Sequence, residues 1–130
     1  MPITKLNAGM DTHIIRDGVE KTAAYTVVVN TDAGKTFYIG SGNSVVFTLP
    51  SIAVGNTYTF VNNNKDGQGL LTISPAALDG IGFKGSATDN KDLINTLATA
   101  KEGDSVTLAS IDQVVSWQVT QASGVWAKEA

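Results

Sequence analysis

Few side chains in this 130-residue chain could carry chemistry. Cysteine is absent, which removes thiolate nucleophiles, disulfides and cysteine metal sites together. His13 is the single histidine, so one chain cannot supply two histidine ligands to a metal, and a Ser-His-Asp triad would depend on this residue alone. We therefore interpret His13 as a surface or interface residue.

The carboxylates are a second potential source of chemistry, because a pair of them could hydrolyse a glycoside. Only Glu20, Glu102 and Glu129 are glutamates, and each lies in a polar, turn-like or terminal context. A catalytic acid needs a raised pKa, which burial or a neighbouring like charge provides. The contexts favour solvated side chains, so we expect no catalytic residues and no enzymatic activity.

Three short motifs resemble ligand sites. Ala33–Thr36 contains Gly-Lys-Thr, but a phosphate-binding loop needs a glycine where Val29 stands and a helix after the motif. The loops Asp66–Gly69 and Asp89–Asp92 offer oxygen ligands, yet neither matches a calcium-binding loop, and Lys91 would repel a cation. The sequence predicts no metal and no cofactor.

The charge balance bears on the partners. Lys and Arg total 9 and Asp and Glu total 12, for a net charge of −3, and no basic stripe is visible. A duplex-DNA binder normally carries such a stripe, so we expect no nucleic-acid partner. No apolar run approaches the ~18 residues that span a bilayer, and the N-terminus lacks the apolar segment of a secretory signal. We expect synthesis in the cytoplasm and no membrane association.

Short runs rich in Val, Ile and Thr alternate with turn residues along most of the chain. β-branched residues favour a pleated sheet surface, and this pattern predicts an all-β sandwich or barrel. In 91–100 the spacing of Leu93, Ile94 and Leu97 suits a short helix, whereas the β-branched residues suit an irregular strand. The other expected strands are 25–29, 37–39, 45–49, 57–61, 70–74, 106–109, 114–120 and 125–127.

Aromatic residues at alternating strand positions indicate a core. They could instead form a stacking platform for sugars or bases, but period-two aromatics are more typical of a buried sheet face. Trp117 and Trp126 flank a turn and could clasp a final hairpin. The predicted core is Val27, Phe47, Leu49, Tyr58, Phe60, Ile73, Val115, Trp117 and Val119.

Residues 1–24 differ from the rest, and we interpret them as an extended N-terminal arm on a sandwich domain of 25–130. The arm mixes charges with apolar residues and holds one expected short strand, Thr12–Ile15. Its apolar residues gain nothing in water, so the arm either adds a strand to a partner's sheet or pairs with its own sheet. The candidate interface residues are Ile3, Leu6, Ile14 and Ile15.

Beyond these patterns, part of the chain is similar to structural modules of tailed bacteriophages. The resemblance is carried by Ser44–Asn62 (SVVFTLPSIAVGNTYTFVN), followed by 71–75 (LTISP). The upstream 25–27 and 32–37 and the later 92–96, 100–104, 117–120 and 124–126 also fit, so the match covers most of 25–128. Such modules occur as capsid decoration (cement) proteins and as parts of tail fibres.

The resemblance implies a structural role in a virion without enzymology. A fibre needs long repeats or a trimeric shaft, whereas this chain is one module with a short arm, which favours a decoration protein on the outer capsid surface. The implied partners are the major capsid protein and copies of itself, as a dimer or trimer. The alternative is a receptor- or carbohydrate-binding module of a tail fibre. For the fold we expect an antiparallel β-sandwich with jelly-roll-like topology.

Overall fold

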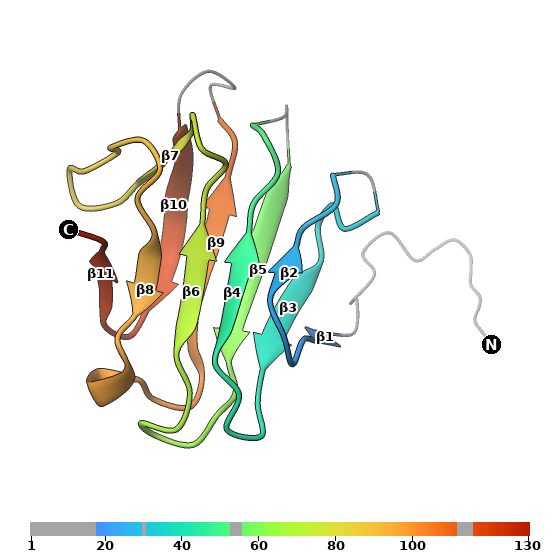
Figure 1. Ribbon diagram of the computed structural model, residues 1–130, viewed down its shortest axis with the longest axis vertical. Helices are drawn as coiled ribbons and strands as arrows, with labels where there is room; N and C mark the ends of the chain where they lie inside the picture. The colour runs from blue at the N-terminus through green and yellow to red at the C-terminus, as the bar shows by residue number, and fades with distance from the viewer. Residues whose placement is uncertain (1–17, 30, 53–55, 112–115) are drawn as a thin grey trace.

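The protein is all-β, as the sequence predicts, in a computed structural model that describes residues 18–29, 31–52, 56–111 and 116–130 (Figure 1). Its one helical element in these residues is a single 3₁₀ turn, η2 (Leu97–Thr99), and no helix there could span a bilayer. The strands are β1 (Val19–Glu20), β2 (Tyr25–Thr26), β3 (Thr36–Ile39), β4 (Val45–Thr48), β5 (Thr57–Asn62), β6 (Leu71–Ser74), β7 (Gly80–Gly82), β8 (Leu93–Asn95), β9 (Asp104–Ala109), β10 (Ser116–Ser123) and β11 (Trp126–Lys128).

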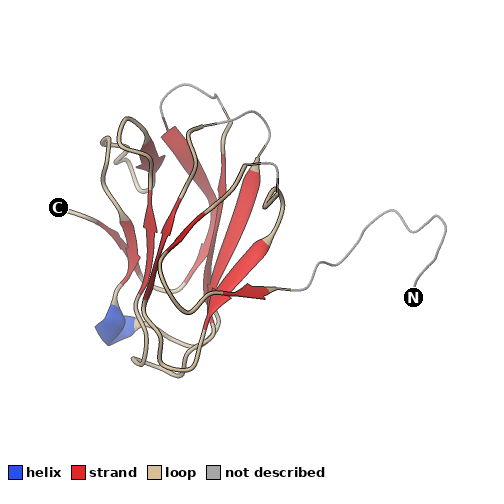
Figure 2. Cartoon of the chain, turned by 45° about the vertical axis from the view of Figure 1, so that its right-hand side comes forward, coloured by secondary structure: helices blue, strands red, loops and turns tan. Residues whose placement is uncertain are grey.

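The strands form two sheets that pack face to face as a sandwich (Figure 2). One sheet has six strands in the order β1-β3-β5-β9-β10-β7, and the other has five in the order β11-β8-β6-β4-β2. Strands β1 and β2 lie at one side of the molecule and β11 lies at the opposite side (Figure 1). The predicted β-sandwich is therefore confirmed.

The strand pairing differs from the expected antiparallel, jelly-roll-like arrangement. From β1 to β9 each successive strand crosses to the facing sheet, so β1, β3 and β5 pair in parallel, as do β2, β4 and β6, and β7 pairs in parallel with β10. Antiparallel pairs remain at β5–β9, β9–β10, β6–β8 and β8–β11. A turn signal marks where the chain reverses, but it does not say whether the next strand pairs with the last one or crosses the core. The jelly-roll expectation was wrong for this reason.

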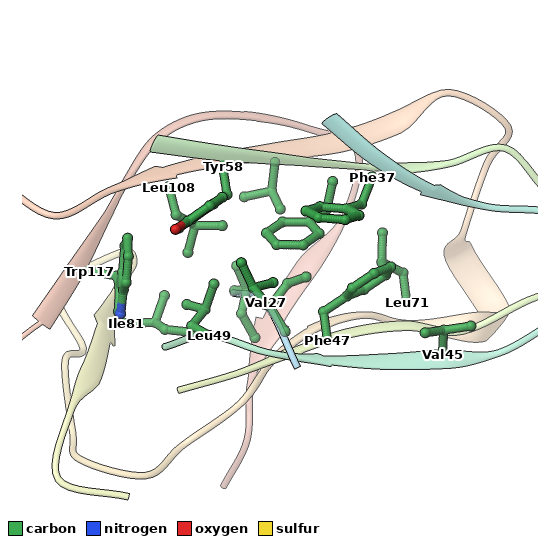
Figure 3. Packing of buried hydrophobic residues seen from close by; sticks show 14 of the residues in the cluster. Val27, Phe37, Val45, Phe47, Leu49, Tyr58, Leu71, Ile81, Leu108 and Trp117 are labelled. Atoms are coloured by element: carbon green, nitrogen blue, oxygen red, sulfur yellow. The ribbon is translucent and has the colours of Figure 1, made fainter. Parts of the chain in front are cut away.

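The core lies between the sheets, where side chains from both inner faces meet (Figure 3). Phe37 and Phe60 extend from one sheet and Phe47 from the other, with ring centroids 4.9 to 5.7 Å apart. Of the predicted core, Val119 is half-buried and packs against the cluster, and Val115 lies outside the described residues. The predicted core residues confirmed as buried are Val27, Phe47, Leu49, Tyr58, Phe60, Ile73 and Trp117.

The C-terminal strands do not form the expected tryptophan-clasped hairpin. Trp117 lies on β10 in the six-stranded sheet, whereas Trp126 lies on β11 in the five-stranded sheet and pairs with Asn95 of β8. The indole N–H of Trp126 donates to the carbonyl of Ser123, 2.9 Å away, and secures the crossing between the sheets. The two tryptophans thus contribute to the core from opposite sheets.

Two segments that the sequence left open are resolved by their neighbours. The segment 91–100 is first strand and then helical turn, because β8 pairs with β6 and β11 and η2 follows directly. In the expected arm, Val19 and Glu20 form β1, which pairs with Phe37 and Tyr38 of β3. The described end of the arm, 18–24, therefore belongs partly to the protein's own sheet.

Candidate functional site

The residues with catalytic potential are scattered. Glu20, Glu102 and Glu129 are all exposed and lie on β1, on the turn before β9 and beyond β11. No group of three or more histidine, cysteine or acidic side chains that could hold a metal ion occurs in the part of the chain that the structure describes. His13 lies outside that part.

The Gly-Lys-Thr turn serves a structural purpose. Lys35 places its ammonium 3.1 Å from the carboxylate of Asp32, and the chain then enters β3 rather than a helix. Asp32 is buried and also accepts hydrogen bonds from the Tyr25 hydroxyl (2.6 Å) and the Val28 amide (2.8 Å). The turn is therefore occupied by an internal carboxylate instead of a phosphate.

Burial alone would raise the pKa of Asp32, but the hydrogen bonds from Tyr25, Val28 and Lys35 outweigh it and hold that pKa below its usual value. The same contact works in the other direction on the tyrosine. Its hydrogen bond to Asp32, with burial and the charge of the carboxylate, raises the pKa of Tyr25 to about 12. The pair is thus held as a neutral phenol and a carboxylate, which joins β2 to the connection that follows it.

The acidic loops are used within the fold as well. Asp66 is exposed, accepts the amide of Glu102 at 3.1 Å and lies 3.5 Å from the Lys101 ammonium. At the other loop, the amide of Asp92 donates to the carboxylate of Glu129, 3.1 Å away. Each carboxylate thus joins two loops.

The aromatic residues that could have formed a binding platform are all internal. Tyr58, Phe60 and Trp117 have no exposed surface, and Trp126 is 4 % exposed. The interpretation of these residues as core is therefore confirmed. None of these four residues can stack on an external ligand.

The outer faces of the two sheets stand out because they lack charge. On the five-stranded sheet, Val46, Thr72, Ile94 and Ala127 lie side by side in register across four strands. The remaining outward residues of this sheet are Thr26, Thr48 and Ser74, which are also uncharged. We call this surface the five-stranded face.

The outer surface of the other sheet, which we call the six-stranded face, also has few charged side chains and carries more hydroxyl groups. Thr36, Thr59 and Thr107 lie in register across three strands, and the hydroxyls of Thr59 and Thr107 are 3.0 Å apart. The one charged side chain that points outward from these strands is Glu20, on the edge strand β1. Solvated sheet faces normally carry polar side chains, and here most of these are hydroxyls, with a single charge on the two faces together.

The N-terminal arm joins the sandwich at the edge of the six-stranded sheet. The amide of Lys21 donates to the carbonyl of Tyr38, so the backbone groups of Glu20 point away from β3, toward the open edge. The candidate interface residues Ile3, Leu6, Ile14 and Ile15 lie outside the described residues, as does the expected strand 12–15. Sequence reasoning found the arm but missed the uncharged faces, which appear only once the strand alternation is known.

Comparison with known proteins found no protein-family model and no curated protein that matches this chain.

Proposed function

We propose that this protein is a capsid decoration (cement) protein of a tailed bacteriophage, which binds the outer surface of the head and stabilises it by bridging capsid subunits. The observation that carries the proposal is that the strands of the two outer sheet faces present a single charged side chain, Glu20 on the edge strand β1. The cores of protein interfaces are depleted of charged residues, because burying an unpaired charge is costly. Broad uncharged faces suit a protein that lies against a shell and against its neighbours.

The expected partners are the major capsid protein and copies of the same chain, as a dimer or trimer. On a symmetric shell, weak contacts add up through multivalency when neighbouring copies touch one another. The net charge of −3 suits a position on the outside of the virion, away from the packaged DNA.

The arm supplies a second means of attachment in this proposal. Ile3, Leu6, Ile14 and Ile15 precede β1, so the arm starts at the open edge of the six-stranded sheet. Apolar side chains buried against a capsid subunit or a sister copy would each contribute about 1.5 kcal/mol or more, before the cost of ordering the arm.

The alternative, a receptor- or carbohydrate-binding module of a tail fibre, would use surface aromatic residues to stack on its ligand. Tyr58 and Trp126 are buried, so that basis is absent, and the decoration protein remains the better supported proposal.

The test is to image virions that lack the protein and then add back purified variants. Wild-type protein should restore density on the outer head surface and resistance of the heads to osmotic shock. Val46→Glu places a charge in the five-stranded face at a residue that is 41 % exposed, so it should fold but bind heads at least tenfold more weakly.

The matched control is Leu78→Glu, which introduces the same charge at a residue that is 84 % exposed in the β6–β7 connection, away from both faces. It should bind like the wild type. Density on the tail instead of the head, or equal binding by both variants, would contradict the proposal.

A further inference from the structure

A pocket of about 420 Å³, lined mainly by residues with polar side chains, opens at the end of the sandwich where the β3–β4, β5–β6 and η2–β9 connections meet. These connections come together at the lower end of the molecule in Figure 1. The volume of the pocket lies within the range of about 300–1,000 Å³ that is typical of small-molecule sites. The residues that line it are Ser41, Gly42, Asn63, Asn64, Lys65, Gln68 and Glu102.

The floor of this pocket is fixed by a buried asparagine. The side chain of Asn64 accepts the amide of Gly42 at 2.7 Å and donates to the carbonyl of Asn43 at 3.0 Å. The backbone N–H of Asn64 donates to the side-chain oxygen of Asn62, and the side-chain NH₂ of Asn62 donates to the side-chain oxygen of Asn95. The pocket is therefore built on a hydrogen-bonded network that reaches into the core, and its shape does not depend on a ligand.

The rim, in contrast, carries polar side chains that the fold does not use. Ser41, Asn63, Lys65, Gln68 and Glu102 are exposed, and none of their side chains makes a hydrogen bond or ion pair within the described residues. The floor is thus fixed by hydrogen bonds within the fold, whereas the rim side chains are free to adjust their rotamers to a ligand.

The chemistry of the lining defines the ligand. Lys65 and Glu102 balance one another in charge, which favours neither an anion nor a cation. No branched aliphatic or aromatic side chain lines the pocket, and its apolar surface consists of backbone and side-chain methylene carbons, which can contact the C–H groups of a polar ligand. What remains is a mixture of hydrogen-bond donors and acceptors, and a sugar hydroxyl can be both donor and acceptor.

We propose that this pocket binds a neutral saccharide, with Asn63, Gln68 and Glu102 as the residues that recognise its hydroxyl groups. This site goes beyond the proposed attachment to the head and does not depend on it. It uses polar side chains at one end of the sandwich and leaves both sheet faces free.

The experiment is an NMR titration of the 13.6 kDa protein, with backbone amide signals as the readout. The probes are the methyl glycosides of glucose, galactose, mannose and N-acetylglucosamine at millimolar concentration. At least one should shift the signals of Gly42, Asn63, Gln68 and Glu102 in a saturable manner. Signals of the separate pocket around Phe83 and Gln118 should not move.

Two variants of the rim should weaken this binding at least tenfold without changing the fold, Gln68→Ala and Glu102→Gln. The matched control is Gln121→Ala, which removes the same amide from an exposed position on β10 and should bind like the wild type. The proposal is overturned if no probe produces saturable shifts at the pocket, or if the rim variants and the control bind equally. Head binding is scored separately, so failure here leaves the decoration role unaffected.

Discussion

Tyr25 is half-buried and Tyr58 is fully buried, and within the described residues only the hydroxyl of Tyr25 has a hydrogen-bond partner. The Tyr25 hydroxyl donates to Asp32, whereas the Tyr58 hydroxyl is buried without a hydrogen bond in the structure. The same substitution therefore tests opposite situations at the two positions. The contribution of a tyrosine hydroxyl to the free energy of unfolding depends on whether it has a hydrogen-bond partner.

We expect Tyr25→Phe to lower the free energy of unfolding by about 1–2 kcal/mol, since it removes a hydrogen bond to a charged group and leaves Asp32 with one donor fewer. Tyr58→Phe should be neutral or stabilising by up to about 1 kcal/mol, because it removes a buried hydroxyl that has no partner. Urea unfolding of both variants measures the two effects. Equal destabilisation by the two substitutions would show that the hydrogen bond to Asp32 does not matter.

The same contact predicts a pH dependence at both ends of the scale. The pKa of Asp32 is lowered by folding, so its contribution to stability is present at neutral pH and is lost as the pH falls below about 4. The pKa of Tyr25 is raised to about 12, so its contribution is present below its usual pKa of about 10 and is lost as the pH rises above that value.

The measurement is the difference in unfolding free energy between wild type and Tyr25→Phe as a function of pH. The difference should be constant from about pH 5 to pH 9 and should shrink outside that range on both sides. A difference that stays the same from about pH 3 to pH 11 would mean that the two residues are not coupled.

At the scale of the elements, the short edge strands set the limits of the sandwich. Strands β1 and β2 have two residues each and β7 and β11 have three, so each sheet ends in a strand too short to template another chain over a long stretch. Val19 of β1 packs against the core, which makes this edge part of the folded domain. The proposed attachment role concerns the residues before β1 rather than this edge strand.

Two truncations separate these parts. A chain that begins at Gly18 keeps β1 and should unfold at nearly the wild-type urea concentration while losing head binding or self-association. A chain that begins at Ala23 also loses β1, and the removal of Val19 from the core should cost about 1–2 kcal/mol more. If the first truncation were as unstable as the second, the arm would belong to the protein's own core. If it kept both stability and assembly, the arm would have no role in attachment.

Period-two patterns in the sequence predict part of this fold but not the pairing of its strands. They state which side chains share a face, and so Phe47, Tyr58, Phe60 and Trp117 are correctly assigned to the core. They do not state which strand is the neighbour, since that depends on contacts between residues far apart in the chain. The parallel pairing of β3 with β5 therefore could not be inferred from the turn signals before and after β4, which lies between them in the chain and belongs to the other sheet.

The pocket could not be predicted for a similar reason. Asn64 and Glu102 lie in loops that are separated in sequence and meet only after the strands have crossed the core. A run of three asparagines at 62–64 is typical of a polar loop and by itself predicts no pocket. Its buried members, Asn62 and Asn64, hold neighbouring connections together.

On the scale of the molecule, the charged side chains of the described residues lie in the connections, on the edge strands and at strand ends, and the two broad faces carry one charge between them, Glu20 at an edge. Association through such faces depends on apolar and hydroxyl contacts, which salt screens far less than ion pairs. We expect head binding to change by less than about threefold between ~50 and ~500 mM sodium chloride.

A partner held by phosphate-like or ionic contacts would instead lose affinity by orders of magnitude over a comparable range. Binding isotherms on purified heads at several salt concentrations distinguish the two. A steep loss of affinity with salt would indicate that the charged ends, rather than the uncharged faces, make the contact.

Because successive strands cross between the sheets, insertions and deletions in the chain are constrained in size. From β1 to β6 the chain winds around the core as a coil, and each full turn of the coil adds one strand to each sheet. Adding or removing a whole turn of the coil widens or narrows both layers together, by about 4.8 Å, and keeps the inside covered. Losing one strand would leave the strand that faces it across the core with its inner side chains uncovered. Lengthening and shortening in this architecture is therefore expected to proceed by pairs of strands.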